Sequence, residues 1–312
     1  MRVGLDVGGT KIEAVALGDD RVDNATVIGR ERLATTPGEA GVVASITQAL
    51  SQLTAQLGTG LDAITSVGIG IPGMIEPGTT IVRHSVNLGV EELDLGAALR
   101  TVLPARVRAD NDVKAAAVGA YALRGGTGSM AYLNLGTGVA AGIILDGELL
   151  GGARGGAGEV GHLSVDPQGP LCRCGQVGCV EAYVGGAALA ERWGVPAAYP
   201  VRDLFDAADA GDPRAIVLRD GAAFGAAAAV RSLMLSVDVE TVVIGGGLSA
   251  LGDRLLDSIR ERLRVEGETS PFLRSLELGA RMELLPVGSP AAALGAALIG
   301  ADDMREGALT HG

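Results

Sequence analysis

Two hydrophobic periodicities alternate along this chain, and together they predict an α/β protein. Short apolar runs that are mostly bounded by glycine, proline or aspartate are typical of buried strands. They lie at residues 2–7, 11–17, 27–33, 64–71, 107–109, 130–135, 139–145, 241–244 and 281–287. Between them, apolar residues recur at helical spacing or alanine dominates, which predicts helices at residues 41–57, 93–103, 113–120, 186–192, 201–210, 213–237, 251–263 and 290–299.

The composition fits a soluble globular protein of about two domains. The 312 residues are 47% apolar and only 3% aromatic, so aliphatic side chains and alanine must build the core. The net charge of −12 argues against nucleic acid or an anionic membrane as the main partner. The longest apolar run, residues 291–301, is too short and glycine-interrupted to span a bilayer. A strand-like run begins directly after Met1 and leaves no room for a signal peptide, so we expect a cytoplasmic protein.

Glycine-rich turns follow two of the predicted strands. Gly8-Gly9-Thr10 separates the first two strands, and Gly136-Thr137-Gly138 separates residues 130–135 from 139–145. Such turns let a phosphate approach the backbone amides, and Asp6 at the strand end could hold a metal ion on that phosphate. An ordinary Gly-Gly hairpin explains the first turn equally well. The repetition is what an actin-like, two-domain nucleotide-binding fold would show.

Polar and glycine-rich segments mark three further strand ends. Pro72-Gly73 turns the chain where open α/β sheets tend to bind ligands. Asp110-Asn111-Asp112 opens the alanine-rich helix, where a carboxylate could act as a general base or the triplet could simply cap the helix. Gly245-Gly246-Gly247 would let a flat or anionic group touch the backbone, although a tight turn is an equally good explanation.

All three cysteines fall within eight residues, as Cys172, Cys174 and Cys179, and His162 precedes them by ten. Three thiolates and an imidazole make a closed tetrahedral set that is typical of structural zinc. A cluster of reactive thiols is the competing interpretation. Two glutamates, Glu159 and Glu181, bracket the segment and could face a substrate that the metal loop supports.

In this order, the motifs resemble the ROK family (repressors, open reading frames and kinases), above all its ATP-dependent glucokinases. The resemblance runs along essentially the whole chain: an Asp-x-Gly-Gly-Thr-Lys opening, Glu159-x-Gly161-His162, and Cys-x-Cys-Gly-x-x-Gly-Cys-x-Glu at residues 172–181. It implies the actin-like (hexokinase/ribonuclease H-like) fold, with the active site in the cleft between two α/β domains. We expect residues 1–112 and a C-terminal helix at about 295–312 in the smaller domain, and residues 113–294, with the zinc site, in the larger one.

The resemblance also implies a role for each matching residue. The nucleotide-binding positions would be Asp6, Gly8, Gly9, Thr10 and Lys11 in the first phosphate loop, Gly136, Thr137 and Gly138 in the second, and Gly246 and Gly247 against the adenosine. The sugar-binding positions would be Gly73, Asn111, Asp112, Glu159, His162 and Glu181, with Asp112 catalytic. The zinc ligands would be His162, Cys172, Cys174 and Cys179.

The implied reaction is transfer of the γ-phosphoryl group of ATP to a primary hydroxyl of a hexose, most simply glucose. Asp112 would accept the hydroxyl proton, Asp6 would order Mg²⁺, and Zn²⁺ would be structural, leaving one His162 nitrogen as an N–H donor to the sugar. The family's fructose, allose, N-acetylmannosamine and N-acetylglucosamine kinases share these motifs. A homodimer or homotetramer is implied as well. A sugar-responsive regulator is the alternative from another class, but the family's repressors carry an N-terminal helix-turn-helix domain, whereas this chain starts at the phosphate-loop strand.

Two segments depart from the family pattern. Val139-Ala140-Ala141-Gly142 follows the second phosphate loop where relatives tend to have more glycine, and Gly89-Val90 follow Asn87-Leu88 where many have an aromatic residue. The first change could narrow the approach to the nucleotide, and the second bears on sugar preference. We interpret Lys114 as a surface residue, and His84 and His311 as a loop and a tail histidine without a role.

Overall fold

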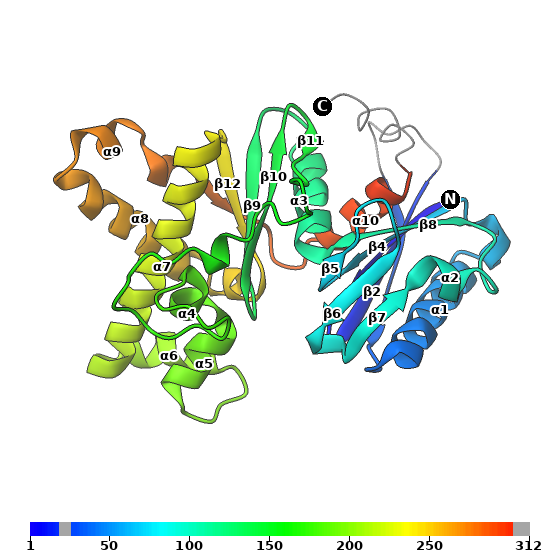
Figure 1. The fold of residues 1–312 in the computed structure, drawn as a ribbon, viewed down its shortest axis with the longest axis horizontal. Coiled ribbons are helices and arrows are strands. Elements are labelled where there is room, and N and C mark those ends of the chain that lie inside the picture. The colour runs from blue at the N-terminus through cyan, green and yellow to red at the C-terminus, as the bar shows by residue number, and fades with distance from the viewer. Residues whose placement is uncertain (19–25, 302–312) are drawn as a thin grey trace. The chain divides into compact units, whose positions relative to one another are not determined.

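The computed structural model describes residues 1–18 and 26–301 (Figure 1), so the tail histidine His311 lies outside the described residues. The chain divides into two compact units. Of the described residues, the first contains 1–18, 26–127, 151–156 and 290–301, and the second contains 128–150 and 157–289.

The first unit is built on a five-stranded sheet in the order β3-β2-β1-β4-β8 and a small sheet in the order β5-β6-β7. Strands β1, β4 and β8 run parallel, whereas β2 is antiparallel to both β1 and β3. Its strands are β1 (Arg2–Val7), β2 (Lys11–Leu17), β3 (Val27–Ala34), β4 (Ser66–Ile71), β5 (Met74–Ile75), β6 (Ile81–Ser85), β7 (Val90–Asp94) and β8 (Arg106–Asn111). Its helices are α1 (Glu39–Gln56), η2 (Leu61–Ala63), η3 (Val86–Leu88), α2 (Leu95–Leu99), α3 (Asp112–Leu123) and α10 (Ala291–Ala301).

The backbone of helix α10 contacts the backbones of the sheet and of α3, because the residues at these contacts are glycines, which have no side chain. A Cβ atom on Gly4 of β1 would lie 1.9 Å from the Ala293 carbonyl oxygen, and one on Gly68 of β4 would lie 1.7 Å from that of Ala296. A Cβ atom on Gly119 of α3 or on Gly295 of α10 would lie at a similar distance from a backbone carbonyl oxygen of the other helix. Helix α10 is therefore fixed across the sheet from residue 291 onward.

This packing also sets the extent of the first unit. The sequence suggested a division after Asp112 and a returning helix from about residue 295. In the structure, α3 and the whole of α10 group with the first unit, and so does the short segment 151–156. The close backbone contacts between α3 and α10 at Gly119 and Gly295 agree with the grouping of the two helices in one unit.

The second unit repeats the plan of the first, with a five-stranded sheet in the order β11-β10-β9-β12-β13. Strands β9, β12 and β13 are parallel, and β10 is antiparallel to β9 and β11. Its strands are β9 (Met130–Leu135), β10 (Val139–Leu145), β11 (Glu148–Leu149), β12 (Thr241–Gly245) and β13 (Met282–Leu284). Its helices are η4 (Val160–His162), α4 (Val180–Val184), α5 (Gly186–Trp193), α6 (Pro200–Asp209), α7 (Pro213–Val237), η5 (Gly247–Leu251), α8 (Asp253–Glu268), α9 (Pro271–Ser275) and η6 (Leu278–Arg281). The duplication that the two Gly-Thr turns suggested is therefore present in the sheets themselves.

The hairpin between β10 and β11 illustrates how local sequence sets the turns. Asp146 and Gly147 both have positive φ angles, of 51° and 79°. A two-residue turn of this kind matches the twist of the flanking strands, and Asp-Gly is a preferred pair for it. Asp146-Gly147 therefore closes the β10–β11 hairpin, in which Leu145 pairs with Glu148.

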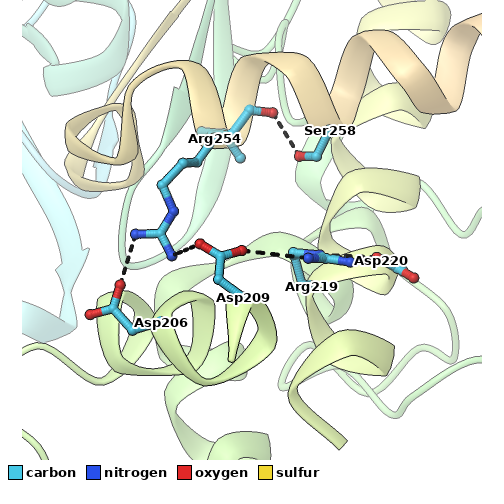
Figure 2. A network of polar contacts seen from close by, with 7 residues as sticks. Asp206, Asp209, Arg219, Asp220, Arg254 and Ser258 are labelled. Atoms are coloured by element: carbon cyan, nitrogen blue, oxygen red, sulfur yellow. Dashed lines mark hydrogen bonds and ion pairs between the residues drawn. The ribbon is translucent and has the colours of Figure 1, made fainter. Parts of the chain in front are cut away.

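Ion pairs join three helices of the second unit around a hollow of about 410 Å³. Arg254 of α8 pairs with Asp206 and Asp209 of α6 at 2.8 and 2.7 Å, and Arg219 of α7 pairs with Asp209 and Asp220 (Figure 2). Because each of these arginines already has carboxylate partners, the network serves to cross-link α6, α7 and α8.

The helix predicted at residues 93–103 is wrong in its boundaries. Strand β7 continues to Asp94, and α2 covers only Leu95–Leu99. The Asp94 carboxylate accepts a hydrogen bond from the Ala97 N–H at 3.1 Å, so it caps this short helix. Upstream, β6 and β7 pair within residues 81–94 as a hairpin of the small sheet, whose few apolar positions gave no clear strand pattern.

Candidate active site and metal centre

The first glycine turn is braced from two sides. The Gly8 N–H donates to the Lys11 carbonyl at 2.9 Å, and the Thr35 hydroxyl donates to the Gly8 carbonyl at 2.7 Å. A Cβ atom on Gly9 would lie 2.9 Å from the carbonyl oxygen of Asn87, so the turn also packs against η3. Thr10, at the tip, is exposed. The turn is thus held in place while its outer face stays open.

The carboxyl ends of the parallel strands bring the predicted acids together. Asp6 of β1 lies opposite Gly70 of β4, which lies opposite Asp110 of β8. Asn111 ends β8 and caps α3, because its side-chain oxygen accepts from the Val113 and Lys114 N–H groups at 3.0 and 3.4 Å. Asp112 is the first residue of α3, so the capping interpretation of the triplet holds for Asn111, whereas the general-base role of Asp112 stays a prediction.

Gly73 lies beside this edge in a conformation that only glycine adopts easily, with φ of 118°. Its carbonyl accepts a hydrogen bond from the Asn111 side-chain amide at 3.4 Å. A Cβ atom at this position would lie 2.8 Å from the Arg83 carbonyl oxygen. Two of the predicted sugar-binding residues are therefore in direct contact within the first unit.

The electrostatic environment of Asp6 is unfavourable for its charge. Burial raises the pKa of Asp6 to about 7, and the negative charges of Asp112 and Glu13 add to the effect. Lys11 and Arg32 lower the pKa but do not compensate. A bound cation would relieve this repulsion, so the carboxylates at this edge fit the ordering of Mg²⁺.

Lys114 is buried, which corrects the expectation that it lies at the surface. Only 8% of the residue is exposed, and its ammonium group donates to the carbonyl of Gly155. A cation in the first turn of a helix opposes the helix dipole, so the position is not one that propensity would select. The contact attaches segment 151–156 to α3 and so contributes to the grouping of that segment with the first unit.

In the second unit, Gly136-Thr137-Gly138 forms the matching turn between β9 and β10. The Gly136 N–H donates to the Gly138 carbonyl at 3.0 Å and closes the turn. The N–H groups of Gly186 and Ala187, at the start of α5, donate to the carbonyls of Gly136 and Thr137 at 2.8 and 3.0 Å. The carbonyl groups of Gly136 and Thr137 thus already accept hydrogen bonds from the protein. Thr137 also borders a pocket.

That pocket has a volume of about 410 Å³ and brings two predicted nucleotide segments together. Gly136 and Thr137 line it on one side and Gly247 on another, with apolar side chains from α5, α6 and η5 between them. Gly246, with φ of 83°, packs against the Leu135 backbone, where a Cβ atom would lie 2.5 Å from its carbonyl carbon. A pocket of this size with mostly apolar walls suits a nucleobase and ribose.

Sequence reasoning missed the outer wall of this pocket, which comes from residues 198–202. Tyr199 is 70% exposed, and the Arg202 guanidinium lies 5.5 Å from the centroid of its ring. Pro200 at the first position of α6 marks a helix start in the sequence. Nothing in the sequence pattern connects this helix start with the distant turn at Gly136. The contribution of residues 198–202 to the pocket is therefore visible only in the folded chain.

The expected metal ligands form one cluster. The ligand atoms of His162, Cys172, Cys174 and Cys179 all lie within 4.8 Å of one another. The sulfurs of Cys174 and Cys179 are 3.7 Å apart, and the Cys172 sulfur is 4.0 Å from His162 Nδ1. Tetrahedral zinc with bonds of about 2.3 Å separates two sulfurs by about 3.8 Å, so the set fits zinc.

The thiols have unequal surroundings. Burial raises the pKa of Cys179 to about 12 and also raises that of Cys172. Hydrogen bonds from the backbone and side chain of Gln176 lower the pKa of exposed Cys174 to about 6. A divalent cation would favour the thiolate at all three positions, since it supplies the positive charge that the protein does not.

The two flanking glutamates, Glu159 and Glu181, precede and follow the cluster residues along the chain. Glu159 is exposed and immediately precedes η4, and its carbonyl accepts from the His162 N–H at 3.2 Å. Glu181 lies in the first turn of α4, and one of its carboxylate oxygens accepts from the Val139 N–H at 2.9 Å. Because His162 faces the cluster through Nδ1, its Nε2 is left for another partner.

Two duplicated sheets of this topology, each with a glycine turn after its first strand, define the actin-like fold of the hexokinase type. Residues 2–301 match the ROK family, and the chain belongs to that family. Two curated relatives illustrate the range of similarity. The glucokinase of Halalkalibacterium halodurans is 31% identical over 317 residues, which covers 94% of this chain and 92% of that protein. The N-acetylmannosamine kinase of Yersinia pseudotuberculosis is 35% identical over 247 residues, covering 78% and 82%.

A solved structure agrees along almost the whole chain. The ROK family glucokinase from Streptomyces griseus, in complex with glucose and AMPPNP, superimposes with a TM-score of 0.74 at 29% identity and covers 96% of this chain and 98% of that one. Among the residues that the structure describes, no helix has the length and apolar character needed to cross a membrane.

Proposed function

We propose that this protein is an ATP-dependent sugar kinase that phosphorylates the primary hydroxyl of a hexose, with glucose as the substrate. The observation that carries the proposal is the placement of Asp112 at the start of α3. There it lies at the carboxyl edge of the parallel strands, next to Asn111 and within electrostatic range of Asp6. Family membership and the nucleotide-sized pocket support the same reaction.

Asp112 acts as the general base. As the sugar hydroxyl attacks, its oxygen forms a bond to the γ-phosphorus, the bond from that phosphorus to the bridging oxygen of ADP breaks, and the hydroxyl proton passes to the Asp112 carboxylate. Asn111 orients the sugar, since its side chain is fixed by the α3 backbone and by Gly73. A base on a rigid helix start needs little reorganisation during the reaction.

The two glycine turns hold the phosphates. Backbone N–H groups of Gly8, Gly9 and Thr10 and of Gly136, Thr137 and Gly138 would donate to phosphate oxygens, with Lys11 adding a positive charge. Mg²⁺, when bound, neutralises the phosphate charge, and Asp6 is the residue that orders it. Gly247 would leave space for the adenosine at the pocket wall, and Gly246 precedes it as the second position proposed to lie against the adenosine.

The sugar hydroxyls are bound by Glu159, His162 and Glu181 in addition to Gly73 and Asn111. His162, through Nδ1, and the three cysteines would hold a structural Zn²⁺ and so fix the loop that carries these residues. With four protein ligands the site would leave no open position for catalysis. The remaining nitrogen of His162 then carries a fixed N–H donor for the sugar.

The whole-chain similarity to a glucokinase favours glucose, because it extends over 94% of this chain. A kinase for N-acetylmannosamine is the second candidate, supported by 35% identity over a shorter span. Kinases for N-acetylglucosamine or fructose are further alternatives.

The test is a coupled assay of the zinc-loaded protein with Mg-ATP and a panel of hexoses and N-acetylhexosamines. We expect the highest kcat/KM with glucose and formation of the 6-phosphate, identified by NMR. Turnover only with N-acetylmannosamine would show that this sugar, and not glucose, is the substrate. Binding of a sugar by calorimetry without phosphorylation of any member of the panel would overturn the kinase and favour a sugar-responsive regulator.

A further inference from the structure

We infer that Glu181 is a positioning residue that fixes the second phosphate turn, and thereby couples donor binding to the zinc-supported wall of the sugar site. This inference deepens the proposed function and rests on it. The wall is defined here as residues 158–162 together with 172–181. All of the contacts that support the inference lie within the second unit.

One carboxylate oxygen of Glu181 is already committed to the protein. It accepts from the Val139 N–H at 2.9 Å, and Val139 directly follows the Gly136-Thr137-Gly138 turn. A Cβ atom on Gly138 would lie only 2.6 Å from the same oxygen. The carboxylate therefore packs on the turn itself, and glycine at position 138 is what leaves room for it.

The opposite side of Val139 meets the other half of the wall. A Cβ atom on Gly161, between the predicted sugar ligands Glu159 and His162, would lie 2.0 Å from the Val139 carbonyl oxygen. The peptide groups on both sides of Val139 are thus enclosed, the N–H by Glu181 and the carbonyl by Gly161. Because Val139 is only 4% exposed, its N–H would have no water to replace a lost acceptor.

Glu181 can serve both ligands because a carboxylate has two oxygens. Oε2 holds the turn, which leaves Oε1 for a sugar hydroxyl. Any displacement of the wall, by loss of zinc or of the sugar, would then shift the acceptor of Val139. The phosphate turn therefore depends on the wall, although residues 136–138 of the turn are not among the proposed sugar ligands.

A purely electrostatic role predicts the opposite effect. A carboxylate beside a phosphate turn repels the donor, so its removal alone would tighten nucleotide binding. Glutamine separates the two roles, because its amide oxygen can still accept from the Val139 N–H while the charge is gone. Alanine removes both the charge and the acceptor.

The experiment measures Mg-ADP affinity by calorimetry without any sugar, for the wild type, Glu181→Gln and Glu181→Ala. We expect Glu181→Ala to bind roughly five- to twentyfold more weakly, as for one lost buried hydrogen bond, and Glu181→Gln to bind as tightly as the wild type or more tightly. Equal affinity of Glu181→Ala and wild type, or equal loss in both variants, overturns the inference. Zinc content and thermal melting verify that the variants are folded.

Gly138→Ala provides an independent test, because its methyl group would displace the Glu181 carboxylate. In the wild-type background we expect Gly138→Ala to weaken Mg-ADP binding, and in the Glu181→Ala background the same change should have a smaller effect. Independent, multiplicative effects of the two substitutions overturn the inference. A wild-type protein that binds Mg-ADP but phosphorylates no sugar in the panel would overturn the proposed function instead, while the ADP comparison would still test Glu181.

Discussion

Asp112 raises the pKa of Asp6 through its negative charge, although the two residues come from distant parts of the chain. Strand β1 ends next to β4 and β4 next to β8, so Asp6, near the end of β1, and Asp112, directly after β8, meet at one edge of the sheet. Burial is the larger cause of the shift, and Glu13 adds to it. Without a cation, the edge therefore carries carboxylates that oppose one another at neutral pH.

We expect Asp6→Asn to stabilise the magnesium-free, zinc-loaded protein at alkaline pH. The pKa of Asp6 is about 7 in the folded protein against an ordinary value of 3.8. The folded state therefore binds the extra proton, and the stability from protonated Asp6 is full below about pH 4 and lost as the pH rises through 7. Asparagine cannot ionise, so its advantage over wild type should grow by on the order of 1–3 kcal/mol between pH 4.5 and 8, allowing for partial solvent exposure.

Urea unfolding at a series of pH values measures this difference. Asp62→Asn, which makes the same substitution at an exposed position of η2, is the control. A difference between Asp6→Asn and wild type that stays constant from pH 4.5 to 8 would mean that Asp6 titrates normally.

Replacing Asp112 with asparagine should abolish turnover while sugar binding persists. Asparagine keeps the size and hydrogen-bonding ability of the side chain but cannot accept the hydroxyl proton. We expect kcat to fall by about 10²- to 10⁴-fold, as for other general bases, and the sugar dissociation constant from calorimetry to change by less than about threefold. Asp110→Asn, two residues upstream and outside the proposed chemistry, is the matched control and should retain most of its kcat. Near-normal turnover of Asp112→Asn would show that another group accepts the proton.

The sequence could predict those parts of the fold that depend on local pattern. The strands at Arg2–Val7 and Lys11–Leu17, the Asp146-Gly147 turn and the long helix Pro213–Val237 follow from apolar spacing and turn residues alone. The repeated Gly-Thr turn also indicated the duplication that the two sheets show. The hairpin β6–β7 escaped because each of its strands has only two apolar residues, which do not alternate regularly with polar ones, so the apolar pattern gives no strand signal there.

Features of the site that depend on distant contacts could not be read from the chain. Lys114 looks like a surface residue in the sequence, and only the carbonyl of Gly155 explains its burial. Tyr199 and Arg202 reach the pocket of Gly136 through the packing of α5 and α6, which no motif encodes. The metal cluster was easier to predict, because its four ligands lie within eighteen residues, His162 to Cys179, and their residue types are diagnostic.

Loss of one cysteine should release zinc and weaken sugar binding. Cys174 is the most exposed of the three, so Cys174→Ser disturbs packing least. We expect metal content to fall from about one zinc per chain, the Tm to drop, and the KM for the sugar to rise by about tenfold or more, because His162 and Glu181 lose their support. Metal content by plasma emission spectroscopy and KM by the coupled assay provide the two readouts.

The nearby Arg173→Ala removes only a surface ion pair with Glu191 and is the control. A metal-free variant with unchanged sugar affinity would separate the metal from sugar recognition.

The close approach of α10 to the sheet predicts a severe penalty for a methyl group at position 68. A Cβ atom on Gly68 would lie 1.7 Å from the Ala296 carbonyl oxygen and 2.9 Å from the Gly300 N, both of them backbone atoms that cannot rotate away. We expect Gly68→Ala to destabilise the protein by about 3 kcal/mol or more, at the upper end for overpacking, measured as the free energy of unfolding in urea. Gly151→Ala is the matched control, because a Cβ atom there would meet no atom within 4 Å and the backbone is not left-handed. Since replacing glycine with alanine also reduces the entropy of the unfolded chain, the control should be neutral or slightly stabilising. Equal stability of Gly68→Ala and Gly151→Ala would mean that α10 does not lie against β4 as the glycine contacts require.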